Sequence, residues 1–153
     1  MTLLDLQSRL REIIADASSP DAPDSPLIPA EKIFIEDKAD IPATIEAEIS
    51  RGTALCAAIA TERVSRDSAA DGLYMATASF RISLFRSAIA PSALTLLTLV
   101  ELLARAITDA PIHATGSPYT FSLAGVEAGS TPKGLDSHTL RAETSWCYET
   151  PKA

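Results

Sequence analysis

The chain has 153 residues and a formal net charge of −7, from 20 acidic against 13 basic residues. Hydrophobic residues make up 46% and charged residues 22%, which is ordinary for a folded domain and excludes disorder of the whole chain. A chain of this size can bury about two thirds of its unfolded surface without a metal or a disulfide. We therefore expect a single domain over residues 1–153.

The acidic balance disfavours nucleic acid and anionic membranes as partners, because phosphate is repelled unless basic residues cluster. The nearest approach to a cluster is Arg81 with Arg86. Residues 88–107 are rich in leucine, but Glu101 and Arg105 leave an uncharged run too short to cross about 30 Å of hydrocarbon. The N-terminus has an early acid and no basic region, so no secretory signal is expected. We predict no nucleic acid and no membrane partner.

The first third of the chain predicts helix, loop, strand and helix. Apolar residues at helical spacing predict a helix over residues 2–17. Four prolines within residues 18–30 exclude its continuation and predict a loop or an extended arm. Residues 31–37 predict a short strand, and residues 41–51 a second helix with Asp40 as its N-cap.

The middle of the chain predicts two strands. Residues 53–64 hold a nearly continuous apolar run, typical of a strand covered on both faces. A polar turn is expected at residues 65–72. Residues 73–86 alternate apolar and polar side chains, which predicts a strand more than twice the usual length of about five or six residues. We expect so long a strand to project beyond the core and pair with another molecule.

The last third predicts a helix over residues 92–109 with Ser92 as its N-cap, then strands over residues 119–126 and 138–149. On one face of the last strand we expect Leu140, Ala142, Thr144, Trp146 and Tyr148. The short turns between strands favour antiparallel pairing. The whole order predicts an α+β domain, a mostly antiparallel sheet of about four to five strands with two to three helices packed on one face.

The histidines give little support for catalysis or metal binding. His113 lies in a loop between prolines, and His138 follows Asp136 by two positions. Nucleophilic catalysis needs a nucleophile, a base and an orienting group, and no such set is visible around either histidine. His138 with Asp136 offers two metal ligands, whereas zinc sites show tighter groups. We interpret both histidines as surface or loop residues and predict no catalytic residue and no metal ligand.

Other candidate groups also have structural interpretations. The spacing of Gly125, Gly129 and Gly134 is not that of a phosphate-binding loop, so we interpret these glycines as turn residues and predict no cofactor. We interpret the neighbouring carboxylates as a solvated face rather than an acid–base dyad. These carboxylates are Glu36 with Asp37, Glu46 with Glu48, and Asp67 with Asp71.

The cysteines and the tryptophan are expected to be structural. Cys56 and Cys147 lie among apolar residues of strand-like segments, so we interpret them as buried free thiols. Trp146 is expected to be a core or interface anchor.

One stretch resembles a pattern found in small phage and prophage proteins. It begins with Ile33-Phe34-Ile35-Glu36-Asp37-Lys38-Ala39-Asp40-Ile41 and continues through Ile45-Glu46-Ala47-Glu48-Ile49 to Gly52. In this pattern a short strand leads into an acidic helix, a glycine and an apolar strand. The later layout, which ends in Trp146-Cys147-Tyr148-Glu149, is also similar to that of phage tail terminator and tail-completion proteins. The resemblance is specific over residues 33–52, and the proline-rich loop departs from it.

This resemblance implies a tail-terminator-like fold and a structural, non-enzymatic role in the virion, with assembly in the host bacterial cytoplasm. Tail terminators form closed rings, usually hexamers, at the head-proximal end of the tail tube. The implied partners are other copies of the chain and tail tube or neck proteins. No catalytic motif or site residue is carried over. A ring needs head-to-tail interfaces that close, and the unpaired edge of the strand at residues 73–86 is expected to supply one.

Two other functions stay open. Apart from the resemblance, the same features also suit a cellular α+β interaction module, such as an adaptor or a secretion-apparatus subunit without catalytic activity. It could also be a small enzyme, in which case a deep pocket should gather His113 or His138 with an acid.

Overall fold

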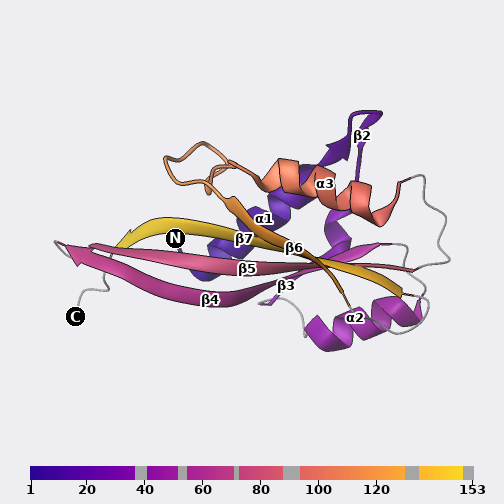
Figure 1. The fold of residues 1–153 in the computed structure, drawn as a ribbon, viewed down its shortest axis with the longest axis horizontal. Coiled ribbons are helices and arrows are strands. Elements are labelled where there is room, and N and C mark those ends of the chain that lie inside the picture. Colours follow the sequence, from indigo (N-terminus) through magenta and orange to yellow (C-terminus); the bar gives the residue numbers. More distant parts are fainter. Residues whose placement is uncertain (37–40, 52–54, 71–72, 88–93, 130–134, 150–153) are drawn as a thin grey trace.

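The computed structural model describes residues 1–36, 41–51, 55–70, 73–87, 94–129 and 135–149 (Figure 1). The helices are α1 (Leu3–Asp16), η1 (a 3-10 turn, Ala30–Lys32), α2 (Ile41–Ser50) and α3 (Leu96–Ile107). The strands are β1 (Ser18–Ser19), β2 (Ala22–Pro26), β3 (Ile33–Ile35), β4 (Cys56–Ala70), β5 (Leu73–Ser87), β6 (Ser122–Ala128) and β7 (Leu135–Glu149). The predicted α+β class is confirmed.

The main sheet is mixed and has five strands in the order β3-β4-β5-β7-β6. Strands β4, β5, β7 and β6 pair antiparallel, as predicted, whereas β3 runs parallel to β4 because the chain crosses over through α2. Helices α1 and α3 cover one face of the sheet, and α2 lies on the opposite face (Figure 1). The prediction of helices on one face therefore holds for two helices and is wrong for α2.

Helix α1 begins with a capping box. The backbone N–H of Thr2 donates to the Asp5 carboxylate at 2.7 Å, and the backbone N–H of Asp5 donates to the Thr2 hydroxyl at 3.1 Å. These bonds to the Thr2 backbone and hydroxyl lower the pKa of Asp5. Leu6, Leu10 and Ile14 then recur on the buried side, so the helix is fixed both by its cap and by its apolar stripe.

The structure corrects three predicted boundaries. The proline-rich segment contains the short antiparallel pair β1–β2 rather than loop alone. Helix α3 begins at Leu96 with Thr95 as its N-cap, whose hydroxyl accepts from the Thr98 N–H at 3.1 Å, and Ser92 lies outside the described residues. The polar stretch predicted as a turn belongs largely to β4, which continues to Ala70 because it pairs with β5 throughout.

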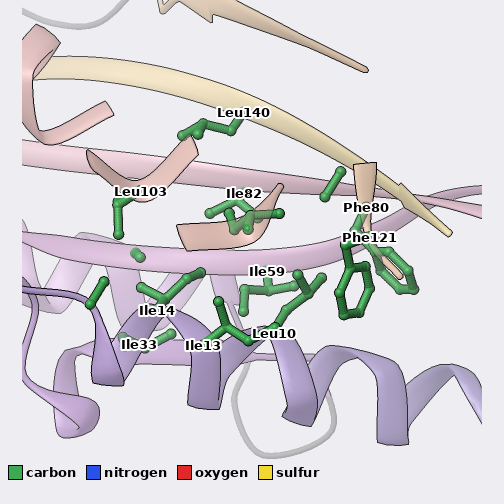
Figure 2. Close-up of a cluster of buried hydrophobic side chains, with 14 of the residues drawn as sticks. Leu10, Ile13, Ile14, Ile33, Ile59, Phe80, Ile82, Leu103, Phe121 and Leu140 are labelled. Atoms are coloured by element: carbon green, nitrogen blue, oxygen red, sulfur yellow. The ribbon is translucent and has the colours of Figure 1, made fainter. Parts of the chain in front are cut away.

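The core lies between the sheet and helices α1 and α3. Figure 2 shows Leu10, Ile13 and Ile14 of α1 facing Ile59 and Ile82 of the sheet. All these side chains are buried, and burial of each contributes about 1.5–3 kcal/mol. The predicted inward face of the last strand is confirmed for its described members, all of them buried, which are Leu140, Ala142, Thr144 and Trp146.

Phe121 closes one end of this core although it lies outside the regular strands. Its ring meets that of Phe80 edge to face, with centroids 6.5 Å apart and planes at 76°. Its backbone N–H donates to Ala110 and its carbonyl accepts from Asp109, each at 2.9 Å. Asp109 has a φ of 63°, which turns the chain after α3 toward this position. The loop before β6 is therefore anchored to the core by one aromatic side chain.

We predict that Phe121→Ala destabilises the domain by about 3–5 kcal/mol, because it removes a buried aromatic contact and leaves a cavity. Thr120→Ala, at the exposed neighbouring side chain, should change stability by less than about 0.5 kcal/mol. Urea denaturation followed by circular dichroism measures both. Equal midpoints for the two variants would contradict the anchoring role of Phe121.

Candidate interaction surfaces

Strand β5 cannot supply the free edge that the sequence led us to expect. It pairs with β4 from Phe85 to Leu73 and with β7 from Ser87 to Leu73, so both of its edges are hydrogen-bonded within the chain. Strand β5 pairs along its length with two other long strands. The paired ends of β4, β5 and β7 extend together beyond α1 and α3 (Figure 1). The prediction that this strand pairs with another molecule is therefore wrong. In the described residues the open edges belong to β3 and the part of β4 beyond it, and to β6 and the part of β7 beyond it.

The outer edge of β4 carries several features that oppose strand addition. Among the described residues, β3 pairs with it only up to Ile59. The carboxylate of Glu36 accepts from the next outward N–H, that of Thr61, at 2.9 Å. The register shifts between Thr61 and Arg63 and again farther on, and Glu62 and Arg63 add charge. Bulges and charges are the means by which proteins protect exposed edges, so this edge is guarded.

The outer edge of β6 is open by comparison. In the described part of the chain no strand pairs with its outer side. The strand contains one charged residue, Glu127, and no proline. The side chain of Val126 is 41% exposed, and a single bulge lies between Leu123 and Gly125. Unpaired N–H and C=O groups on such a strand can receive an extended segment of another protein.

The face of the sheet away from α1 and α3 carries a cross-strand polar network. Arg141 of β7 donates to Glu62 of β4 at 3.0 Å and also pairs with Glu127 of β6. Hydrogen bonds to these two carboxylates, first that of Glu62, raise the pKa of Arg141. Ser79 donates to Glu143 at 3.1 Å. The network satisfies these charges within the chain.

A small apolar groove lies between α2 and this face of the sheet. Its volume is about 210 Å³, smaller than the ~300–1,000 Å³ of typical small-molecule sites. Its lining is mainly apolar and comprises Ile41, Pro42, Ile45, Ala58, Ala60, Arg81, Ser83 and Phe85. Arg81 is exposed and forms no ion pair with any residue the structure describes. The groove therefore joins an apolar lining to a free positive charge.

Helix α3 presents an exposed stripe on its outer side, away from the core. Leu97 is 58% exposed, more than any other large hydrophobic side chain among the described residues. Glu101 and Arg105 are exposed one and two turns farther along. Leu97, Glu101 and Arg105 therefore lie together on one exposed side of the helix.

The two histidines lie in different elements of the fold. His113 is exposed in the loop after α3. His138 is half-buried on β7 opposite Leu84, and its Nδ1 has no hydrogen-bond partner among the described residues. The side chain of Asp136 lies outside the described residues. No group of three or more possible metal ligands occurs in the described ranges.

Two further predictions about single residues are corrected. Gly125 lies within β6 rather than in a turn, whereas Gly129 fits the predicted turn and Gly134 is outside the described residues. A Cβ on Gly129 would stand 1.8 Å from the Ser137 hydroxyl, so a larger residue there would require the Ser137 side chain to move. Glu46 is exposed as predicted, but Glu48 is buried and its assignment to a solvated face is wrong.

Glu48 fastens α2 to the rest of the domain. Its carboxylate lies 2.8 Å from Lys32 Nζ and 3.3 Å from a guanidinium nitrogen of Arg51. The side chain of Arg51 is 70% exposed, so Lys32 supplies the better-shielded charge. Cys56 lies nearby and is buried, as predicted, whereas the side chain of Cys147 is outside the described residues. Burial, and secondarily the charge of Glu48, raises the pKa of the Cys56 thiol to about 11.

No family model matches the sequence, and no curated protein matches it. In the described residues no helix is long and apolar enough to cross a membrane. The surfaces themselves therefore carry the functional interpretation.

We predict that Lys32→Met destabilises the domain by about 1–3 kcal/mol, because the buried Glu48 carboxylate loses its closest compensating charge. Arg51→Met also removes a positive charge beside Glu48, but from an exposed position, and should destabilise the domain by less than about 1 kcal/mol. Urea midpoints at pH 7 compare the two. A larger effect of Arg51→Met would contradict the role assigned to Lys32.

In a Cys147→Ser background, where Cys56 is the single thiol, we predict very slow native labelling by an aromatic disulfide reagent at pH 8. With a pKa of about 11, roughly one thiol in a thousand is ionised at that pH. The thiol of Cys56 has a pKa of 9.0 when exposed in the unfolded chain and of about 11 in the folded chain. The unfolded chain therefore loses the thiol proton at lower pH, and the stability of the folded state falls as pH rises from 9.0 to about 11. Labelling in urea gives the reference rate, and equally fast native labelling would contradict burial of the thiol.

Proposed function

We propose that the chain is a structural, non-enzymatic subunit of a phage or prophage tail, similar to tail terminator and tail-completion proteins. Copies of the chain form a ring, and the ring adds to the end of the tail tube. The partners are the chain itself and tail tube or neck proteins. The proposal places the protein in the virion and, during assembly, in the host bacterial cytoplasm.

The observation that carries this proposal is the unequal treatment of the two sheet edges. At the edge of β4, charges, bulges and the Glu36 carboxylate oppose pairing with an added strand, whereas the edge of β6 has few such features. An edge without such protection can receive an extended segment of another protein. We assign the β6 edge to an extended segment of the neighbouring tail tube or neck protein, which would bind by strand addition.

The first experiment asks whether the purified chain forms rings. Light scattering after size exclusion gives the mass, and negative-stain images give the shape, over a range of concentrations. Closed rings that add to one end of tail tubes from the same phage or prophage are the expected result. A strict monomer that never adds to such tubes would overturn the proposal and favour the cellular interaction module.

We predict that Val126→Lys weakens binding of the ring to tail tubes about tenfold or more, which corresponds to about 1.4 kcal/mol. A lysine at an exposed edge opposes strand addition. The matched control is Val64→Lys, because Val64 is a similarly exposed valine, at 46%, on the guarded edge of β4. Cosedimentation with tubes measures both variants. If the two lysines weaken binding equally, β6 is not the docking edge.

A further inference from the structure

We propose that the ring contact between copies places the outer side of α3 from one copy into the α2 groove of the next, with Leu97 in the groove and Glu101 paired to Arg81. This inference rests on the proposed function and names the surfaces by which the ring closes. It concerns the two faces of the sheet, and it leaves the β6 edge free for another partner.

Apolar complementarity is the first support. Leu97 is 58% exposed on α3, and the groove of about 210 Å³ has an apolar lining on the other side of the same sheet. The lining of the groove includes the small residues Ala58 and Ala60 together with the larger apolar residues Ile45 and Phe85. A branched aliphatic side chain is the kind of group that such a groove can bury.

Charge complementarity is the second support. Arg81 lies at the groove without an ion-pair partner among the described residues, although Arg141 beside it on β7 is paired twice. Glu101 follows Leu97 by four residues, so both side chains project from the same side of α3. An incoming α3 therefore carries an apolar group and a carboxylate together, to match an apolar recess and a guanidinium.

The placement of the two surfaces also fits a ring. Helix α3 lies on one face of the sheet and α2 on the other (Figure 1). A contact between unlike surfaces is heterologous, and it repeats from copy to copy until a rotation closes it. A pair of like surfaces would stop at a dimer. Segments of other proteins in the groove are the alternative occupants that the following experiment separates.

The test is a charge exchange on the full chain. Arg81→Glu and Glu101→Arg are both at exposed positions, and each should weaken self-association about tenfold or more by placing like charges together. Combined in one chain, the two changes should restore the association constant to within about threefold of the original. A 1:1 mixture of the two single variants should also associate, because every contact then again pairs opposite charges. Light scattering and sedimentation velocity measure all samples.

Matched controls separate this contact from net charge and from stability. Arg63→Glu and Glu31→Arg make the same charge changes at other exposed positions and should leave the association unchanged. Leu97→Ser should weaken association without lowering the urea midpoint, since Leu97 is outside the core.

The outcomes are distinguishable. Rings that form normally in Arg81→Glu or in Glu101→Arg overturn this contact and leave the proposed function standing. Absence of rescue in both the double variant and the mixture also overturns it, and it points to another occupant of the groove. A strictly monomeric parent chain overturns this contact and the proposed ring together.

Discussion

The double pairing of β5 is the constraint on which the rest of the structure depends. Because this strand is paired with β7 over its whole length and with β4 from Leu73 to Phe85, its two faces are fixed for the entire sheet. Phe80, Ile82 and Leu84 are buried toward α1 and α3, while Arg81, Ser83 and Phe85 point toward α2. A shift of one residue in either pairing would turn the side chains of one strand to the other face of the sheet. The buried core and the groove therefore depend on the same strand registers.

The same pairing explains why the molecule has two unlike sides. On the core side, two helices bury a continuous apolar layer. On the other side, one helix covers part of the sheet and is fastened by Glu48, Lys32 and its own apolar residues, which leaves a recess and a polar network beside it. Unlike sides are what a head-to-tail contact requires, so the asymmetry of the fold and the proposed ring have a common origin.

The edges of the sheet complete this division of roles. The fold uses Glu36 and the bulges of β4 to guard one edge where the short β3 ends. At β6 the pairing with β7 leaves an outer side with little charge. The two proposed contacts therefore depend on different interactions. The contact between copies depends on side-chain burial and charge pairing, and the contact at the β6 edge depends on backbone hydrogen bonds.

Local structure and the identity of the core could largely be predicted from the sequence. The period of α1, the alternation in residues 73–86 and the inward set at Leu140 to Trp146 depend on neighbours along the chain, so the sequence predicts them and the structure confirms them. Serine and threonine are comparable caps, so the sequence does not choose between Ser92 and Thr95, whereas in the structure the Thr95 hydroxyl caps α3. The sequence does not predict the end of β4, because pairing with β5 keeps its polar last residues in a strand.

What the tertiary structure alone decided is which segments meet. Residues far apart in the sequence decide the neighbours of β5, the side taken by α2 and the burial of Glu48. They also decide that Arg81 lies at the groove with no ion-pair partner among the described residues. Periodicity predicts which face of a segment is buried, but it does not predict the element against which that face packs. For that physical reason the candidate surfaces became visible only once the strands had been placed in order.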